Sequence, residues 1–275
     1  MVNPTNDEKC AKGRKPTPQI VKSYNSLRAK AWLFALATKL GIEFTKAGKR
    51  PNYKGLVEEI HEIGVPEDFS GGEARALQRW ASGKVQPSPM ALNMLENARE
   101  KPLTGTKNLY ERGPHGSVLF IAIDPKAEPS TPRYLATMPT DFKREILGMN
   151  SGSANKRMSE RAQSVLAHAQ SCGADWLAKE SDIGILEKLS GAIMLYRYAL
   201  STLHSLDYLD EFLQTTLNHE KTRQVLLDVG ISLEELVKLL GQVIAADAGK
   251  LFAAFDGNAP KRIKELSLDA TCVFV

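Results

Sequence analysis

The chain has few cysteines and lacks the sequence signatures of the common enzyme classes. Its three cysteines, Cys10, Cys172 and Cys272, are too few and too scattered for a disulfide framework or a CxxC zinc site. No Walker loop, GxGxxG, HExxH or GxSxG motif occurs. We therefore expect a reducing cellular environment, no catalytic activity, no cofactor and no metal ion. His168 and Cys172 have a spacing that can hold a metal, but Cys172 belongs to an apolar stripe, which favours a packed core thiol.

Long uncharged hydrophobic runs are also absent. The most apolar window, residues 183–206, contains Glu187, Lys188 and Arg197, so it predicts a core helix and not a membrane span. No apolar run follows the charges at the N-terminus, as a signal peptide would require. We expect a cytoplasmic protein that does not bind membranes.

Basic side chains gather in the first part of the chain. Residues 1–115 hold 19 Lys and Arg against 12 Asp and Glu, whereas the remaining 160 residues hold 17 against 20. The excess is steepest in residues 1–54, with 12 basic and 3 acidic side chains. A basic end on a nearly neutral body suggests a polyanionic partner. The alternative is a solvated, lysine-rich tail.

Hydrophobic spacing and proline positions divide the chain into four parts. Residues 1–18 are polar and basic and predict a flexible arm. Residues 19–101 show helical spacing and predict a small helical domain. Residues 102–155 are rich in proline and predict an irregular connector, in which the apolar run 117–123 is either a short strand or a helix fragment. Residues 156–275 carry long apolar stripes and predict a helical bundle.

The stretch from residue 70 to residue 96 predicts two short helices joined by a turn. Ser70 and Glu73 form a capping box at the start of the first helix. At about 100° per residue, its two faces separate by polarity. The inward face holds Ala74, Leu77, Trp80 and Ala81, and the outward face holds Arg75, Arg79 and Ser82 with Gln78 at the flank. Gly83 is a helix stop, and Pro87 and Pro89 open the next helix.

The outward face has side chains that suit the DNA major groove. Arg75 and Arg79 can each bind a guanine edge or a phosphate, and Gln78 can bind adenine. Basic loop residues can hold phosphates and set the register, and the arm can add salt-dependent affinity without sequence preference. The candidate DNA-contacting residues are Arg75, Gln78, Arg79, Ser82, Lys84, Lys49, Arg50, Lys54, Lys12, Arg14 and Lys15.

Residues 56–96 resemble the lambda-repressor-like helix-turn-helix family. In this resemblance LVEEIHEIG is the supporting helix, GEARALQRWASG is the recognition helix with the W-x-x-G stop, and MALNMLENA is the packing helix. It extends over more of the N-terminal domain if the helix at 20–40 is the family's first helix. The turn at 64–72 has nine residues, whereas three or four are usual. The resemblance implies that a helix at about residues 73–82 enters the major groove.

These features predict a mainly α protein with a helix-turn-helix-like domain, an irregular connector and a C-terminal helical bundle. The predicted function is that of a sequence-specific DNA-binding protein, a transcriptional regulator of bacterial type, with double-stranded DNA as its partner. We expect a homodimer, because two copies related by a two-fold axis place their recognition helices about 34 Å apart, which is one turn of DNA. Helices at 182–205 and 233–255 can supply its interface or only their own core, and an effector pocket between helices is equally allowed.

The alternative interpretation belongs to a different class of function. It is a non-enzymatic helical interaction protein, for example a component of a phage-defence or mobile-element assembly. In that case the basic face binds a protein or RNA.

Overall fold

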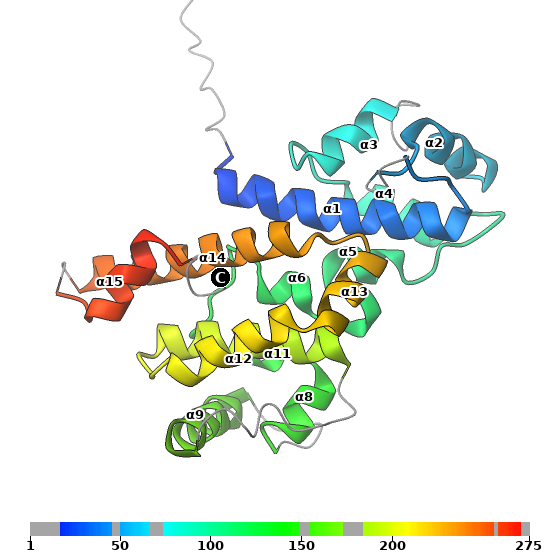
Figure 1. Cartoon of the computed structure of the whole chain (residues 1–275). Helices are drawn as coiled ribbons and strands as arrows, with labels where there is room; N and C mark the ends of the chain where they lie inside the picture. The colour runs from blue at the N-terminus through cyan, green and yellow to red at the C-terminus, as the bar shows by residue number, and fades with distance from the viewer. Residues whose placement is uncertain are drawn as a thin grey trace, which may run out of the picture.

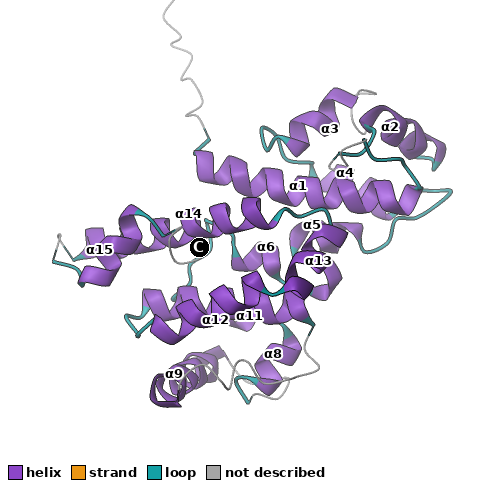
Figure 2. Cartoon of the chain, in the orientation of Figure 1, coloured by secondary structure: helices purple, strands orange, loops and turns teal. Residues whose placement is uncertain are grey.

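The computed structural model describes residues 17–45, 50–66, 74–148, 155–172, 184–255 and 258–270. Over these residues the protein is mainly helical, and the only extended pairing is an isolated antiparallel bridge between Phe44 and Pro51 (Figures 1 and 2). The predicted α class is confirmed. None of the described helices has both the length and the apolar character needed to cross a membrane.

Helix α1 (Gln19–Leu40) contributes to two separate hydrophobic cores. It ends at Gly41, which takes the left-handed conformation with φ 73° that often ends a helix. One face of α1 buries Tyr24, Leu27 and Ala31, and another buries Ala29, Trp32, Leu33 and Leu36. Helix α1 is therefore covered on more than one face.

The first core, called here the N-terminal core, lies between α1 and four shorter helices. These are α2 (Tyr53–Glu62), α3 (Ala74–Ala81), α4 (Pro89–Glu96) and α5 (Thr106–Glu111). Its buried side chains include Trp32, Leu33, Leu36, Leu56, Ile60, Leu77, Trp80, Leu95 and Tyr110. Helix α4 begins with Pro89 in its first turn, as predicted, and Ser88 is its N-cap.

The second core, called here the body core, is built around α11 and includes one face of α1. After η2 (Pro114–Gly116), its elements are α6 (Leu119–Ala122), α7 (Pro132–Ala136), α8 (Thr140–Glu145), α9 (Asn155–Cys172), α11 (Ile185–Ser201), α12 (Asp207–Asn218), α13 (Glu220–Asp228), α14 (Leu233–Ala254) and α15 (Lys261–Leu268). Helix α14 begins after Ser232, whose side chain accepts a hydrogen bond from the Glu235 amide. Helix α14 runs beside α1 on the side opposite α3 (Figure 1).

The predicted connector contains short helices and belongs to the two cores. Tyr110 of α5 is buried in the N-terminal core, whereas Val118 and the residues after it are buried in the body core. The run 117–123 is helical at Leu119–Ala122, so the strand alternative is wrong. Several prolines start helices here: Pro132 lies in the first turn of α7, behind the Thr131 cap. Helices of four to six residues are too short to show a period in the sequence.

The turn after α3 approaches the backbone of α1 so closely that only glycine fits. Gly83 has φ 68°, and a β-carbon there would overlap the Lys22 carbonyl oxygen. We expect Gly83→Ala to lower the free energy of unfolding by at least about 2 kcal/mol. The alanine would be strained in the left-handed conformation, and its β-carbon would force the turn away from the backbone of α1. Urea titration followed by tryptophan fluorescence measures this loss.

Gly41→Ala is the matched control for Gly83→Ala. Gly41 has φ 73°, but nothing lies within 4 Å of a β-carbon built on it. Its expected cost is therefore conformational strain alone, about 1 kcal/mol. Equal losses in the two variants would show that the contact between the turn and α1 contributes nothing.

Candidate nucleic-acid interface

The inner face of α3 is packed in the N-terminal core. Leu77 is fully buried, and Trp80 and Ala81 are nearly so. The Trp80 and Trp32 ring centroids lie 5.8 Å apart at an interplanar angle of 51°, a favourable tilted aromatic geometry. The predicted inward side of this helix is confirmed for these three residues, while Ala74 at its start is half-buried. The predicted capping residues Ser70 and Glu73 lie outside the described residues.

The outer face of α3 is open to solvent. Arg75, Gln78 and Arg79 are all exposed. Among the described residues, none of their side chains has a hydrogen-bond or ion-pair partner. Helix α3 lies on the side of α1 that faces away from α14 (Figure 1). These side chains are therefore held on a rigid helix and are free to contact a ligand.

The turn after α3 holds two more predicted contact residues. The Ser82 hydroxyl donates a hydrogen bond to the Arg79 carbonyl oxygen at 3.0 Å, so its oxygen remains available only as an acceptor for other groups. Lys84 is exposed, and the described residues offer its ammonium group no partner. Of the two, Lys84 is the better placed to contact an anion.

The remaining predicted residues lie around α2 or outside the described residues. Lys54 is in the first turn of α2 and is 3.8 Å from Glu58, with both side chains mostly exposed; such pairs contribute little stability. Arg50 is exposed near Tyr53, whose pKa is raised by burial and lowered in part by Arg50. The predicted residues outside the described part of the chain are Lys49, Lys12, Arg14 and Lys15.

Hydrogen bonds fasten the end of α3 to α1. The Ser26 hydroxyl donates to the Ala81 carbonyl oxygen at 2.6 Å. In the turn, the Gln86 side-chain amide donates to the buried Asn25 side-chain oxygen at 2.7 Å. Together with the close approach of Gly83, these contacts fix α3 on α1, so the outward arginines have a set position relative to the rest of the domain.

The two segments that pack together here contain no carboxylate side chain. Residues 17–42 and 74–95 hold seven basic residues and no Asp or Glu. The seven are Lys22, Arg28, Lys30, Lys39, Arg75, Arg79 and Lys84. The neighbouring α2 differs, because Glu58 and Glu62 are exposed on it and Glu59 is half-buried. Because Lys30 faces α14 and pairs with Glu235 there, the charge next to α3 comes mainly from Arg75, Arg79 and Lys84. A polyanion is favoured beside α3 and disfavoured along the later part of α2.

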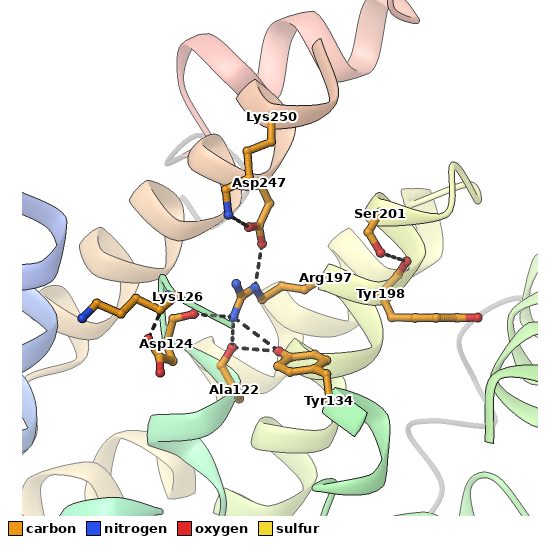
Figure 3. A network of polar contacts seen from close by, with 9 residues as sticks. All are labelled: Ala122, Asp124, Lys126, Tyr134, Arg197, Tyr198, Ser201, Asp247 and Lys250. Carbon is orange, nitrogen blue, oxygen red and sulfur yellow. Dashed lines mark hydrogen bonds and ion pairs between the residues drawn. The ribbon is translucent and has the colours of Figure 1, made fainter. Parts of the chain in front are cut away.

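A second polar cluster lies inside the body core, and its centre is Arg197 (Figure 3). The Arg197 side chain is fully buried on α11 and its Nε donates to the Asp247 Oδ2 at 2.7 Å. Its Nη1 donates to the carbonyl oxygens of Ala122, at 2.6 Å, and Asp124, at 3.1 Å. Burial raises the pKa of Tyr134 to about 12, so its hydroxyl keeps its proton at neutral pH and donates to the Ala122 carbonyl at 3.0 Å.

The Arg197 cluster joins α11, α14, α6 and α7 around a buried ion pair, so it is a structural centre. It was not predicted from the sequence, where Arg197 served only to argue against a membrane span. One available signal was a pair of opposite charges, Arg197 and Asp247, each within an apolar stripe. Charges at such positions need a partner.

In the part of the chain that the structure describes, no three His, Cys, Asp or Glu side chains are grouped as a metal ion requires. His168 is exposed on α9, and the Cys172 side chain is outside what the structure describes.

Three comparisons with known proteins gave no match. No family model, curated protein or solved structure matches this chain. The resemblance to the helix-turn-helix family therefore rests on the sequence alone.

Proposed function

We propose that the protein binds double-stranded DNA through the outer face of α3 and acts as a regulator of transcription. The observation that supports this most is the set Arg75, Gln78 and Arg79, exposed and unpartnered among the described residues on a helix whose other face is packed. These are side chains that bind guanine and adenine edges in the major groove.

The dimensions of α3 fit this role. A helix is about 10–12 Å across with its side chains, which matches the major-groove width of about 12 Å, and the eight residues of α3 extend about 12 Å along its axis. Arg75 and Arg79 are four residues apart and so lie on one face of the helix. Because the helix is held on α1, its insertion requires little reordering of side chains or backbone, which lowers the cost of binding.

A fluorescence-polarisation titration with labelled duplex DNA tests the proposal. The logarithm of the association constant should fall linearly with the logarithm of salt concentration, with a slope of about −0.9 for each phosphate neutralised. Single-stranded RNA of the same length is the comparison ligand. Failure to bind duplex DNA at low salt, or a clear preference for the RNA, would show that the proposal is wrong.

We further propose that the protein forms a homodimer through its C-terminal helices. Helix α11 is unsuited to the interface because its residues from Ser190 to Leu200 are all buried in the body core. The end of α14 and α15 are better suited, since Phe255 is 37% exposed and Leu268 is 79% exposed. A dimer would present two α3 helices to successive turns of DNA.

The substitution Leu268→Glu tests this interface. The wild-type protein should sediment at about twice the chain mass of 30.2 kDa, and Leu268→Glu should shift it to the monomer, because a charge is costly in an apolar interface. Leu227→Glu, at a side chain that is 61% exposed on α13, is the control and should stay dimeric. A monomeric wild type would contradict the proposed dimer.

A further inference from the structure

We propose that Lys22 of α1 and Lys84 of the turn after α3 form a phosphate-binding pair at the C-terminal end of α3. This inference rests on the proposed DNA binding and specifies where the duplex backbone lies. Lys84 was a candidate from the sequence, whereas Lys22 is brought to the site only by the fold.

Gly83 brings the two lysines together. The Lys22 carbonyl oxygen and the Ser26 amide nitrogen occupy the place that a β-carbon would need, so no side chain fits at this position. Lys84 is the next residue, and its amide donates to the Arg79 carbonyl oxygen at 3.2 Å. The backbones of both lysines are therefore fixed beside the last turn of the arginine-bearing helix, although they are far apart in the sequence.

Lys22 differs from the other lysines of α1 because its charge is not used within the protein. Lys30 pairs with Glu235 of α14 at 2.6 Å. The Lys39 ammonium group donates to the Thr104 carbonyl oxygen at 2.7 Å. Lys22 and Lys84 have no such partner in the described segments. Because the backbones of the two residues lie close together, the two side chains can each contact a phosphate of the same DNA strand.

The charges around the two lysines indicate on which side of the domain the phosphate backbone passes. Around the pair, residues 17–42 and 74–95 contain no Asp or Glu. On α2, by contrast, Glu58 and Glu62 are exposed and would repel a phosphate backbone. The backbone is therefore expected to run past Lys22 and Lys84 while α3 lies in the adjacent groove. Such contacts position the protein on the duplex and carry no sequence information themselves.

The test compares two double variants that remove the same charge from the N-terminal domain. Lys22→Gln with Lys84→Gln removes the proposed pair. Lys39→Gln with Lys101→Gln removes two exposed lysines near the other end of α1, where the Lys101 ammonium donates to the Lys39 carbonyl. For each protein, polarisation titrations over salt concentration are measured on a preferred duplex and on a scrambled one, and urea midpoints confirm folding.

We expect the slope for Lys22→Gln with Lys84→Gln to become less steep by about 1.8, or 0.9 for each phosphate that is no longer neutralised. Both duplexes should weaken by the same factor, so the preference ratio is unchanged. Lys22→Arg with Lys84→Arg should restore the slope. A slope change no greater than that of the control pair, in a wild type that binds duplex DNA, would overturn the inference and leave the proposed function intact. A wild type that binds no duplex contradicts the proposed function itself.

Discussion

The substitution Arg197→Met should lower the free energy of unfolding by about 3–5 kcal/mol, because it leaves the Asp247 carboxylate buried without its main partner. Asp247 is only 5% exposed, and the Lys250 ammonium at 3.6 Å is mostly in solvent. The substitution also frees the carbonyl oxygens of Ala122 and Asp124 from their guanidinium donor. Urea unfolding monitored by circular dichroism measures the change.

Two control variants separate charge burial from packing. Lys250→Met removes the solvent-exposed member of the cluster and should cost less than about 1 kcal/mol. Combining Arg197→Met with Asp247→Leu removes both buried charges, so the double variant should be more stable than the sum of the two single losses predicts. Additive losses, or a cost for Arg197→Met no greater than that for Lys250→Met, would contradict a central ion pair.

Replacing both outward arginines of α3 should abolish sequence preference. With Arg75→Ala and Arg79→Ala, the absence of each guanine contact removes about 1–3 kcal/mol of discrimination, so the ratio of preferred to scrambled affinity should fall about 30-fold or more. Competition polarisation with the two duplexes measures this ratio. The fold should be retained, since both side chains are exposed and the packed face of α3 is unchanged.

Arg99→Ala with Arg112→Ala is the matched control for the α3 variant. These two arginines are also exposed and lie between α4 and η2. The same charge is removed, so overall affinity should weaken modestly at low salt while the preference ratio stays the same. A similar fall in that ratio for both pairs would mean that α3 is not the helix that distinguishes bases.

The body core affects the proposed function because one face of α1 is packed in it, and α3 packs on α1. The Tyr24 hydroxyl of α1 donates to the Phe120 carbonyl oxygen of α6 at 3.0 Å. Lys30 of α1 is paired with Glu235 of α14. Because α6 in turn is held by Arg197 through Ala122, a loosened body core should also loosen the support of the proposed DNA-contacting helix.

The parts of the fold that were predictable have strong local signals. The two covered faces of α1, its stop at Gly41 and the start of α14 at Ser232 follow from spacing and capping residues. The separation of α3 into an arginine face and a Leu77 and Trp80 face is likewise a local property of the helix. These features need no knowledge of distant residues.

The features that were not predictable depend on contacts between distant residues. Arg197 and Asp247 are 50 positions apart and meet only when α14 packs on α11. Lys22 reaches the α3 turn because Gly83 allows a backbone contact. The short helices α6 and α7 owe their form to burial of Phe120 and Tyr134 in the body core, and periodicity does not reveal elements of this length.

The central claim is that α3 distinguishes DNA sequences, and selection from a randomised duplex library tests it most directly. After several rounds of capture by the wild-type protein, sequencing should show one enriched motif containing guanines, and capture by the Arg75→Ala, Arg79→Ala protein should enrich no motif. Enrichment of the same motif by both proteins, or of none by the wild type, would contradict the account.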